Sequence, residues 1–184
     1  MVNRAEHLYL RKIFPMTRKL LVFLIFSVVF LQFSCLKTNQ DCEFKPCEFV
    51  APAAESQEIS AYLGANGLPG TKHCSGMYYN ISNPGTGKSP DGCSYVNVKY
   101  RGYTTTNSVP FDERWTTAAL INLNQVITGW RSGIPLLKEG GIMTLYVPPY
   151  LGYGTQPLKD ANGNVIVPGN SILIFDIELV TVER

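Results

Sequence analysis

The sequence is poor in the residues and motifs on which much enzyme chemistry depends. It has only two histidines, His7 and His73, among 184 residues. A Ser-His-Asp or Cys-His catalytic arrangement therefore has little to draw on. The motifs GxGxxG, GxxxxGK[ST] and HExxH, which mark dinucleotide, nucleoside triphosphate and zinc peptidase sites, do not occur. These absences disfavour covalent, nucleotide and metal chemistry, and we expect neither a cofactor nor a metal.

The sequence also lacks an apolar run long enough to span a bilayer. Arg18 and Lys19 precede an uncharged run over residues 20–31, which is shorter than the roughly 20 residues of a spanning helix. This pattern predicts a secretory signal peptide over residues 1–34, with either Met1 or Met16 as the start. The protein is therefore expected to be exported.

The apolar run ends in LQFSC (residues 31–35), which resembles a bacterial lipoprotein signal in which the cysteine becomes the lipidated first residue. Gln32 stands where that pattern usually has a large aliphatic residue. We expect lipidation at Cys35 and attachment to a membrane of the cell envelope, because more than one acyl chain anchors a protein stably. Ordinary cleavage and an uncleaved anchor are the alternatives.

Neither sign of charge dominates the sequence. Residues 1–34 hold five of the 16 basic and one of the 14 acidic residues, so the mature chain has 11 basic and 13 acidic residues and a net charge of −2. No run of five or more basic residues remains after residue 34. Nucleic acids and anionic lipid surfaces are therefore not expected as electrostatic partners.

Four cysteines remain after Cys35, namely Cys42, Cys47, Cys74 and Cys93. Export permits disulfides, and four cysteines allow three connectivities. We favour neighbour pairing, Cys42 with Cys47 and Cys74 with Cys93. The alternative is a zinc site formed by Cys42, Cys47, His73 and Cys74. The spacing of these residues is unlike a zinc knuckle or ribbon, and the adjacent His73 and Cys74 would have difficulty pointing at one ion.

The remaining chain divides into a tether with a short helix (residues 35–70) and a domain (residues 71–184). The helix is predicted over residues 55–63, with Ser56 as its N-cap. Apolar and polar residues alternate over residues 95–101, 143–147 and 173–179, as in half-buried antiparallel strands. Helical spacing over residues 128–138 predicts one short helix, in which Pro135 requires a first-turn or 3₁₀ position. The fold class is α+β, an antiparallel sheet crossed by one short helix.

Six motifs follow one another in the second half of the chain: VKYRG (98–102), Phe111-Asp112, VITGW (126–130), LKEGG (137–141), VPPYLGYG (147–154) and ILIFDIEL (172–179). Together they resemble the FKBP-type peptidyl-prolyl isomerases, which bind macrolides such as rapamycin. The resemblance implies a five-stranded, half-wrapped sheet. It also implies isomerisation of proline-containing polypeptides, here during the folding of exported or envelope proteins, by a monomer. The alternatives are a non-catalytic peptide-binding module or chaperone and a structural lipoprotein of a surface or motility complex.

The resemblance also implies a role for each site residue. Trp130 would form the floor of an apolar pocket, Tyr100, Phe111 and Phe175 its walls, and Val126 and Ile127 its rim, with the Ile127 N–H donating to the bound peptide. Tyr153 would offer its hydroxyl group and Asp112 a carboxylate, while Ile166 and Val167 match hydrophobic residues before the last strand. Of these, Asp112, Tyr153, Trp130 and Phe175 would be catalytic and the others substrate-binding. Without the resemblance, the prediction is that each of these aromatic side chains packs in the core and that Asp112 is an acidic residue of a surface turn.

Two segments depart from the family pattern. Residues 117–119 (Thr-Ala-Ala) stand in the region where relatives commonly have a pocket phenylalanine, which predicts a wider or shallower wall. The loop over residues 153–168 is longer than in minimal members and contains a predicted turn at residues 160–164. Both segments border the expected substrate, so they bear on peptide preference and macrolide affinity.

Overall fold

The structure is a computed structural model that describes residues 42–183. The predicted signal peptide and the predicted lipidation site Cys35 lie outside the described residues. Within residues 42–183, no helix is long and apolar enough to cross a membrane.

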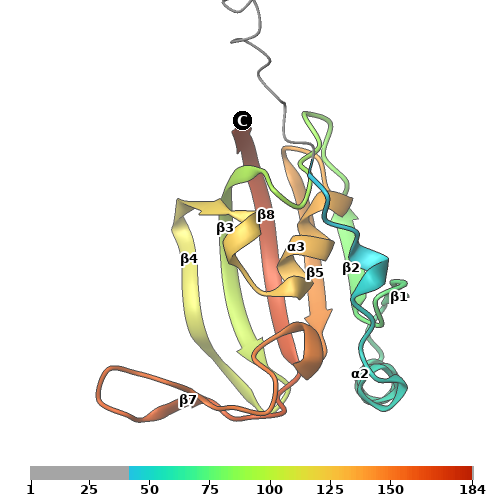
Figure 1. Cartoon of the computed structure of the whole chain (residues 1–184), viewed down its shortest axis with the longest axis vertical. Helices are drawn as coiled ribbons and strands as arrows, with labels where there is room; N and C mark the ends of the chain where they lie inside the picture. Colours follow the sequence, from blue (N-terminus) through green and yellow to red (C-terminus); the bar gives the residue numbers. More distant parts are fainter. Residues whose placement is uncertain (1–41, 184) are drawn as a thin grey trace, which may run out of the picture. The chain divides into compact units, whose positions relative to one another are not determined.

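The three alternating runs form neighbouring strands of one antiparallel sheet (Figure 1). They are β3 (Tyr95–Thr104), β5 (Gly141–Val147) and β8 (Leu173–Glu183), with β8 between the other two. In β3, Val96, Val98 and Tyr100 are buried, whereas the side chains between them are partly exposed. The alternation of apolar and polar residues in the sequence therefore matches the alternation of buried and partly exposed side chains, as predicted.

The sheet continues on both sides of these strands, in the order β1-β2-β5-β8-β3-β4. Strands β1 (Thr71–Lys72) and β2 (Tyr78–Asn83) lie beside β5, and β4 (Asn107–Asn122) forms the opposite edge. The α+β prediction is confirmed, and the sheet has five longer strands plus the two-residue β1.

Strand β4 is the longest element of residues 42–183, and no pattern in the sequence predicted it. It lies at the edge of the sheet, and its burial pattern does not alternate. Its pairing with β3 is interrupted between Arg114 and Ala119, where several β4 residues bulge out opposite Lys99. A bulged edge strand lacks the regular burial that produces an alternating sequence.

Helix α3 (Thr128–Gly133) lies across one face of the sheet, with the 3₁₀ turn η3 (Ile134–Leu136) directly after it (Figure 1). Pro135 occupies the 3₁₀ turn, as the sequence required. Added Cβ atoms at Gly129 and Gly133 would lie 2.5 Å from Val147 and 2.8 Å from Leu145. These two glycines therefore let α3 rest directly on β5.

Helix α2 (Ala53–Asn66) contains the predicted helix but begins earlier, at Pro52 as N-cap. The predicted N-cap Ser56 is wrong: this residue lies inside the helix and is 2% exposed. Ile59 and Leu63 pack with Tyr146, which alternates with the core residue Leu145 on β5. Helix α2 therefore covers part of the sheet face opposite α3.

The main core lies between the sheet and α3. Its fully buried side chains come from the three central strands, from η3 and from the turns and loops around them: Met77, Val96, Val98, Leu123, Ile134, Leu137, Met143, Leu145, Val147, Leu151, Val167, Leu173, Ile177 and Leu179. Two short strands, β6 (Leu158–Lys159) and β7 (Val165–Val167), pair as a separate hairpin before β8. The predicted turn joins them, with the Asp160 carboxylate accepting the Asn162 and Asn164 N–H groups at 2.9 and 2.8 Å.

The cysteines pair differently from the prediction. The disulfides are Cys42–Cys93 and Cys47–Cys74, with Cα–Cα distances of 5.7 and 5.4 Å. Cys74 precedes β2 and Cys93 precedes β3, and these two strands are antiparallel with β5 and β8 between them. Neighbour pairing is therefore wrong, because Cys74 and Cys93 lie at opposite ends of the sheet. Cys42 and Cys47 instead crosslink the N-terminal segment to both ends.

Candidate functional site

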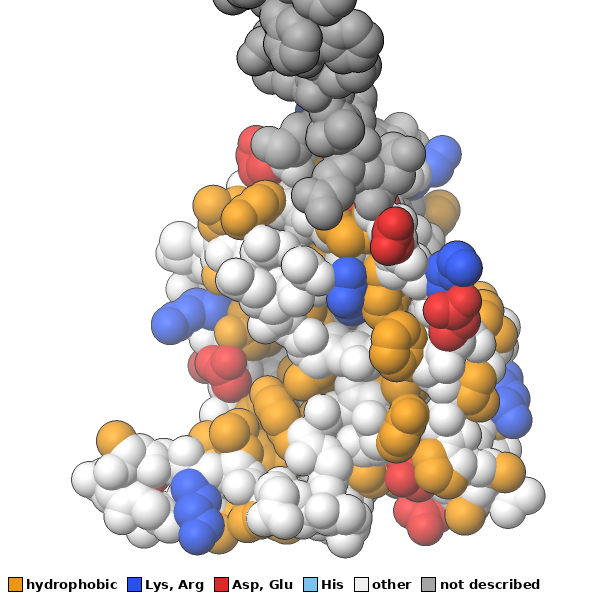
Figure 2. Space-filling view, in the orientation of Figure 1, with side chains coloured by type: hydrophobic (Ala, Val, Ile, Leu, Met, Phe, Trp, Pro, Cys, Tyr) orange, Lys and Arg blue, Asp and Glu red, His pale blue; other side chains and the backbone are white. Residues whose placement is uncertain are grey.

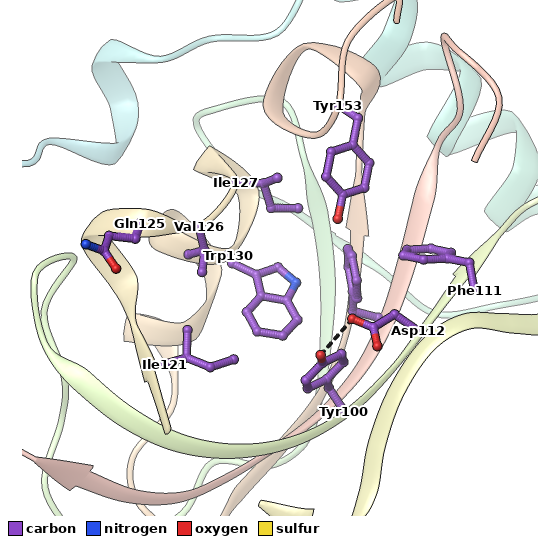
Figure 3. Close-up of a pocket in the computed structure, with 10 residues that line it drawn as sticks. Tyr100, Phe111, Asp112, Ile121, Gln125, Val126, Ile127, Trp130 and Tyr153 are labelled. Atoms are coloured by element: carbon purple, nitrogen blue, oxygen red, sulfur yellow. Dashed lines mark hydrogen bonds between the residues drawn. The ribbon is translucent and has the colours of Figure 1, made fainter. Parts of the chain in front are cut away.

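A cavity of about 260 Å³ opens on the face of the sheet that carries α3. Its lining comes from β3, β4, α3, β8 and the turns beside them: Tyr100, Phe111, Asp112, Ile121, Gln125, Val126, Ile127, Trp130, Tyr153 and Phe175 (Figure 3). Figure 2 shows hydrophobic side chains gathered on this face between α3 and the projecting hairpin β6–β7. The volume is slightly below the usual range for drug-sized ligands, so the cavity suits a ring-sized apolar group.

Four aromatic rings form the inner wall by edge-to-face contacts. The Trp130 ring centroid lies 5.0 Å from that of Tyr100 and 5.2 Å from that of Phe175, and both interplanar angles are 83°. Phe111 meets Phe175 at 5.8 Å and 81°. Perpendicular packing is a favoured geometry for aromatic pairs, so each ring restricts its neighbour. The indole, only 4% exposed, closes the bottom of the cavity.

Gly102 on β3 allows two of these rings to meet. A Cβ at this position would lie 2.8 Å from both Phe111 and Phe175. Any side chain here would push one of the rings away, because such close approaches are not tolerated. The glycine of the VKYRG motif therefore helps to shape the cavity wall.

Three polar side chains of the cavity, Tyr100, Asp112 and Tyr153, gather at one edge. The Tyr100 hydroxyl donates a 2.7 Å hydrogen bond to the Asp112 carboxylate (Figure 3). Burial, followed by this hydrogen bond, raises the pKa of Tyr100 above its usual range. Burial and the Asp112 charge also raise the pKa of Tyr153. Both phenols are therefore protonated donors at neutral pH, and the Tyr153 hydroxyl points toward the cavity.

The segment before α3 forms the opposite rim. Ile127 is the N-cap of α3, and its carbonyl accepts the N–H groups of Trp130 and Arg131 at 3.0 and 3.2 Å. Within residues 42–183, no backbone or side-chain acceptor takes the Ile127 N–H. A donor at the mouth of an apolar cavity is therefore free to bind a ligand carbonyl.

Eight of the ten predicted site residues line this cavity together, and two do not. Val167 is fully buried in the main core, and Ile166 is 40% exposed on the hairpin. Two lining residues, Ile121 and Gln125, were not predicted. Ile121 pairs with Val96 in the β3–β4 ladder, so recognising β4 as a strand would have placed it on the cavity face.

The cavity wall near residues 117–119 differs from the family pattern. Thr117 is exposed in the β4 bulge, and Ala118 and Ala119 are partly exposed. Ile121, a few residues later, supplies an apolar side chain to the cavity. This part of the wall is therefore aliphatic and lacks the additional ring of the family pattern.

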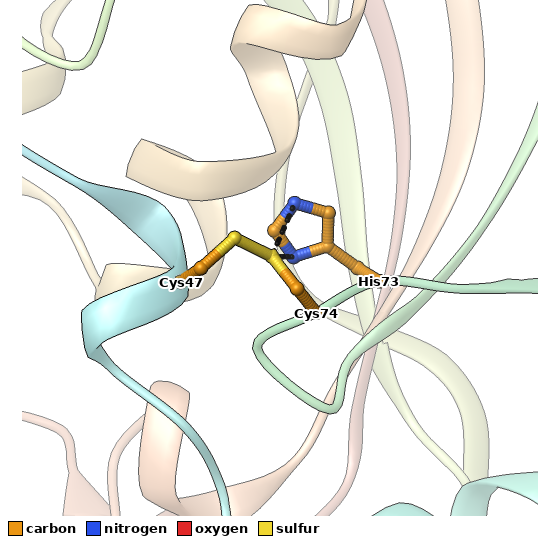
Figure 4. Close-up of side chains that lie close together, drawn as sticks. All are labelled: Cys47, His73 and Cys74. Atoms are coloured by element: carbon orange, nitrogen blue, oxygen red, sulfur yellow. Dashed lines mark hydrogen bonds between the residues drawn. A yellow bond between two sulfur atoms is a disulfide. The ribbon is translucent and has the colours of Figure 1, made fainter.

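The alternative zinc set does not survive as a group of free ligands. Cys47 and Cys74 are joined in a disulfide beside His73 (Figure 4), and Cys42 is joined to Cys93. A disulfide sulfur offers no thiolate to a metal. The Cys74 sulfur lies 3.7 and 3.6 Å from Nδ1 and Nε2 of His73. Nδ1 accepts the Ser75 N–H at 3.2 Å, and burial lowers the pKa of His73.

Comparisons with known proteins agree with this geometry. A family model described as FKBP-type peptidyl-prolyl cis-trans isomerase matches residues 87–180, which include all lining residues of the cavity. FkpA of Aeromonas hydrophila, named as an isomerase of this type, is 35% identical over 139 residues, which are 72% of this chain and 48% of that protein. The peptidyl-prolyl cis-trans isomerase Mip of Coxiella burnetii is 35% identical over 133 residues, 70% of this chain and 55% of Mip. This chain thus spans about half the length of these curated relatives.

Solved structures match in fold as well. A peptidyl-prolyl cis-trans isomerase from Pseudomonas syringae superposes with a TM-score of 0.60 at 26% identity, covering 73% of this chain and 98% of that one. FkpA from Escherichia coli gives a TM-score of 0.59 at 29% identity, covering 72% and 61%. The sheet and its crossing helix are therefore an arrangement shared with these proteins.

Proposed function

Because the chain belongs to the FKBP-type peptidyl-prolyl cis-trans isomerase family, we propose that it accelerates cis/trans rotation about X-Pro bonds in polypeptides. One observation carries this proposal: a ring-sized apolar cavity is floored by Trp130, and its rim carries two donors, the Ile127 N–H and the Tyr153 hydroxyl. Such a cavity fits a prolyl ring and leaves the amide at the mouth, next to Ile127 and Tyr153.

Rotation about a prolyl amide needs no nucleophile and no proton transfer. The barrier of about 18–20 kcal/mol arises from the partial double bond of the planar amide. Twisting removes the resonance and much of the dipole, so an apolar surrounding favours the twisted form over the planar one. A ten-thousandfold acceleration requires about 5.5 kcal/mol of preferential binding of that form. Burial in a dry cavity and one or two directed hydrogen bonds can supply this amount.

Seven of the ten lining residues have a defined part in this mechanism. Trp130 supports the prolyl ring from below, and the walls formed by Tyr100, Phe111 and Phe175 exclude water. The Ile127 N–H and the Tyr153 hydroxyl donate to carbonyl groups of the bound segment. Asp112 holds Tyr100 in place and lends negative charge to the rim, but it does not act as a base, because no proton leaves.

Export and membrane attachment are further parts of the proposal. Disulfides persist in oxidising compartments, and the structure contains two. Together with the signal-like N-terminus, they support an exported protein anchored through Cys35, acting as a monomer on folding envelope proteins. Macrolides of the rapamycin class are proposed to occupy the same cavity.

A direct assay tests the activity. Exchange of an Ala-Leu-Pro-Phe peptide, followed by NMR, should be faster with residues 42–184 in oxidised form than without protein, and rapamycin should abolish the gain. Equal exchange rates with and without the protein would contradict isomerase activity. If proline peptides still change the Trp130 fluorescence in that case, the protein is a peptide-binding module instead.

The Tyr100–Asp112 pair provides a test of the rim. Asp112→Asn removes the charge but keeps an acceptor for the Tyr100 hydroxyl, whereas Tyr100→Phe keeps the ring and removes the hydrogen bond. We expect each change to lower kcat/KM by about three- to tenfold, with less than about 1 kcal/mol lost from the free energy of unfolding, since the carboxylate is exposed. The double variant should lose little more than either single one. Strictly additive losses in kcat/KM would show that the two groups act separately.

A further inference from the structure

The N-terminal segment over residues 42–50, here called the strap, runs beside α3 and contacts it through the 3₁₀ turn η1 (Pro46–Glu48) (Figure 1). Cys42 and Cys47 fix it to Cys93 and Cys74, and the Ala51 N–H donates to the Ser75 carbonyl at 2.9 Å. The family match begins only at residue 87. The strap is therefore an addition to the matched region, held at both ends.

One strap residue, Phe44, forms a stack with α3 and the loop before β3. The guanidinium carbon of Arg131, on α3, lies 4.0 Å from the centre of the Phe44 ring. The Arg131 Nε donates a 2.7 Å hydrogen bond to the Gly92 carbonyl. A Cβ on Gly92 would lie 2.5 Å from the Phe44 ring, so this ring rests on the Gly92 backbone. Phe44, Arg131 and Gly92 thus form one contact unit next to the Cys42–Cys93 disulfide.

This contact unit is next in sequence to the cavity floor. Arg131 follows Trp130, and a helix of six residues has too few internal hydrogen bonds to hold its own orientation. Trp130 faces the core, whereas Arg131 extends to the strap, so α3 is held from two directions. A rotation or shift of α3 would move the indole away from Tyr100 and Phe175, its neighbours at 5.0 and 5.2 Å.

We propose that Phe44 and Arg131 are positioning residues for the isomerase site, through which the strap holds Trp130 at the depth that a prolyl ring requires. This inference rests on the proposed function. It assigns a part in substrate binding to a segment that contributes no lining residue to the cavity. Small displacements of groups that position a substrate can reduce rates by up to about a hundredfold.

The test separates positioning from general stability. In a Trp115→Phe background, which leaves Trp130 as the only tryptophan, Phe44→Ala and Arg131→Met should each lower kcat/KM by about tenfold. The Trp130 emission maximum should shift to longer wavelength as the indole becomes less enclosed. Phe44→Tyr keeps the ring under the guanidinium and should restore both values. All measurements are made at a temperature at which unfolding curves show the variants to be folded.

Leu63→Ala is the matched control, because Leu63 is equally part of the fold but packs in the α2 cluster on the other face. It should lower the unfolding midpoint without changing kcat/KM or the Trp130 emission. Equal changes in kcat/KM for Phe44→Ala and Leu63→Ala would overturn the proposal, as would an unchanged Trp130 emission in Phe44→Ala. If the starting protein has no isomerase activity, the proposed function fails, and the emission shift still decides whether the strap positions Trp130.

Discussion

Replacing Trp130 by alanine is expected to destroy isomerase activity and to destabilise the domain severely. The side chain is 4% exposed and contacts Tyr100 and Phe175. Large-to-small changes of this kind cost about 3–5 kcal/mol of unfolding free energy. The same change removes the floor of the cavity, so kcat/KM should fall by about a hundredfold or more even where the variant is folded. Urea unfolding and peptide exchange, measured at low temperature, give the two values.

A control on the same segment separates the two effects. Ile134 is fully buried in the same core, but it does not line the cavity. Ile134→Ala should lose about 2–5 kcal/mol of unfolding free energy and keep most of its kcat/KM when folded. Trp130→Phe, which keeps an aromatic floor, should lie between the wild type and Trp130→Ala in activity. A folded Trp130→Ala with wild-type kcat/KM would refute the cavity mechanism.

The second large effect is expected on removal of the disulfides. Cys42–Cys93 and Cys47–Cys74 connect positions 51 and 27 residues apart. In the chain-entropy model, closing loops of these lengths stabilises the folded state by about 4 and about 3.5 kcal/mol. The combined loss of unfolding free energy on removing both disulfides is therefore comparable to the total stability of many domains, which is about 5–15 kcal/mol. The pairwise variants Cys42→Ser/Cys93→Ser and Cys47→Ser/Cys74→Ser should show these losses in guanidinium unfolding.

Peptide mapping without reduction tests the connectivity itself. A proteolytic digest should contain one peptide pair joined through Cys42 and Cys93 and another joined through Cys47 and Cys74. A pair joined through Cys74 and Cys93 would contradict the structure.

The unfolding measurements on the cysteine variants have a matched control in the strap. The variant Lys45→Ala/Glu48→Ala removes a surface ion pair whose side chains are both well exposed. It should change the unfolding free energy by less than about 1 kcal/mol.

The central part of the fold was predictable because its strands have one buried face. In β3, β5 and β8, apolar residues recur at every second position, and the structure buries those positions. The helix that carries Trp130 was predictable for a similar reason, and Pro135 marked the change from α-helix to 3₁₀ turn. In each of these elements, a local pattern in the chain corresponds directly to what each side chain contacts.

Other features depend on which distant segments meet, and local patterns carry no such information. Edge strand β4 has no regular burial pattern and was missed, and with it Ile121 as part of the cavity wall. The four cysteines allowed three connectivities, and the sheet order excluded the favoured one by placing Cys74 and Cys93 at opposite ends. The strap contact between Phe44 and Arg131 spans nearly half of the chain and has no motif at all.

The sequence by itself determined the fold class, the family resemblance and eight of the residues that line the cavity, because hydrophobic periodicity and ordered motifs are properties of neighbouring residues. Only the tertiary structure decided that Val167 belongs to the core and that Ile121 and Gln125 line the cavity. It also decided that two disulfides attach the strap beside α3. These outcomes follow from strand order and register, which are set by packing across the whole domain.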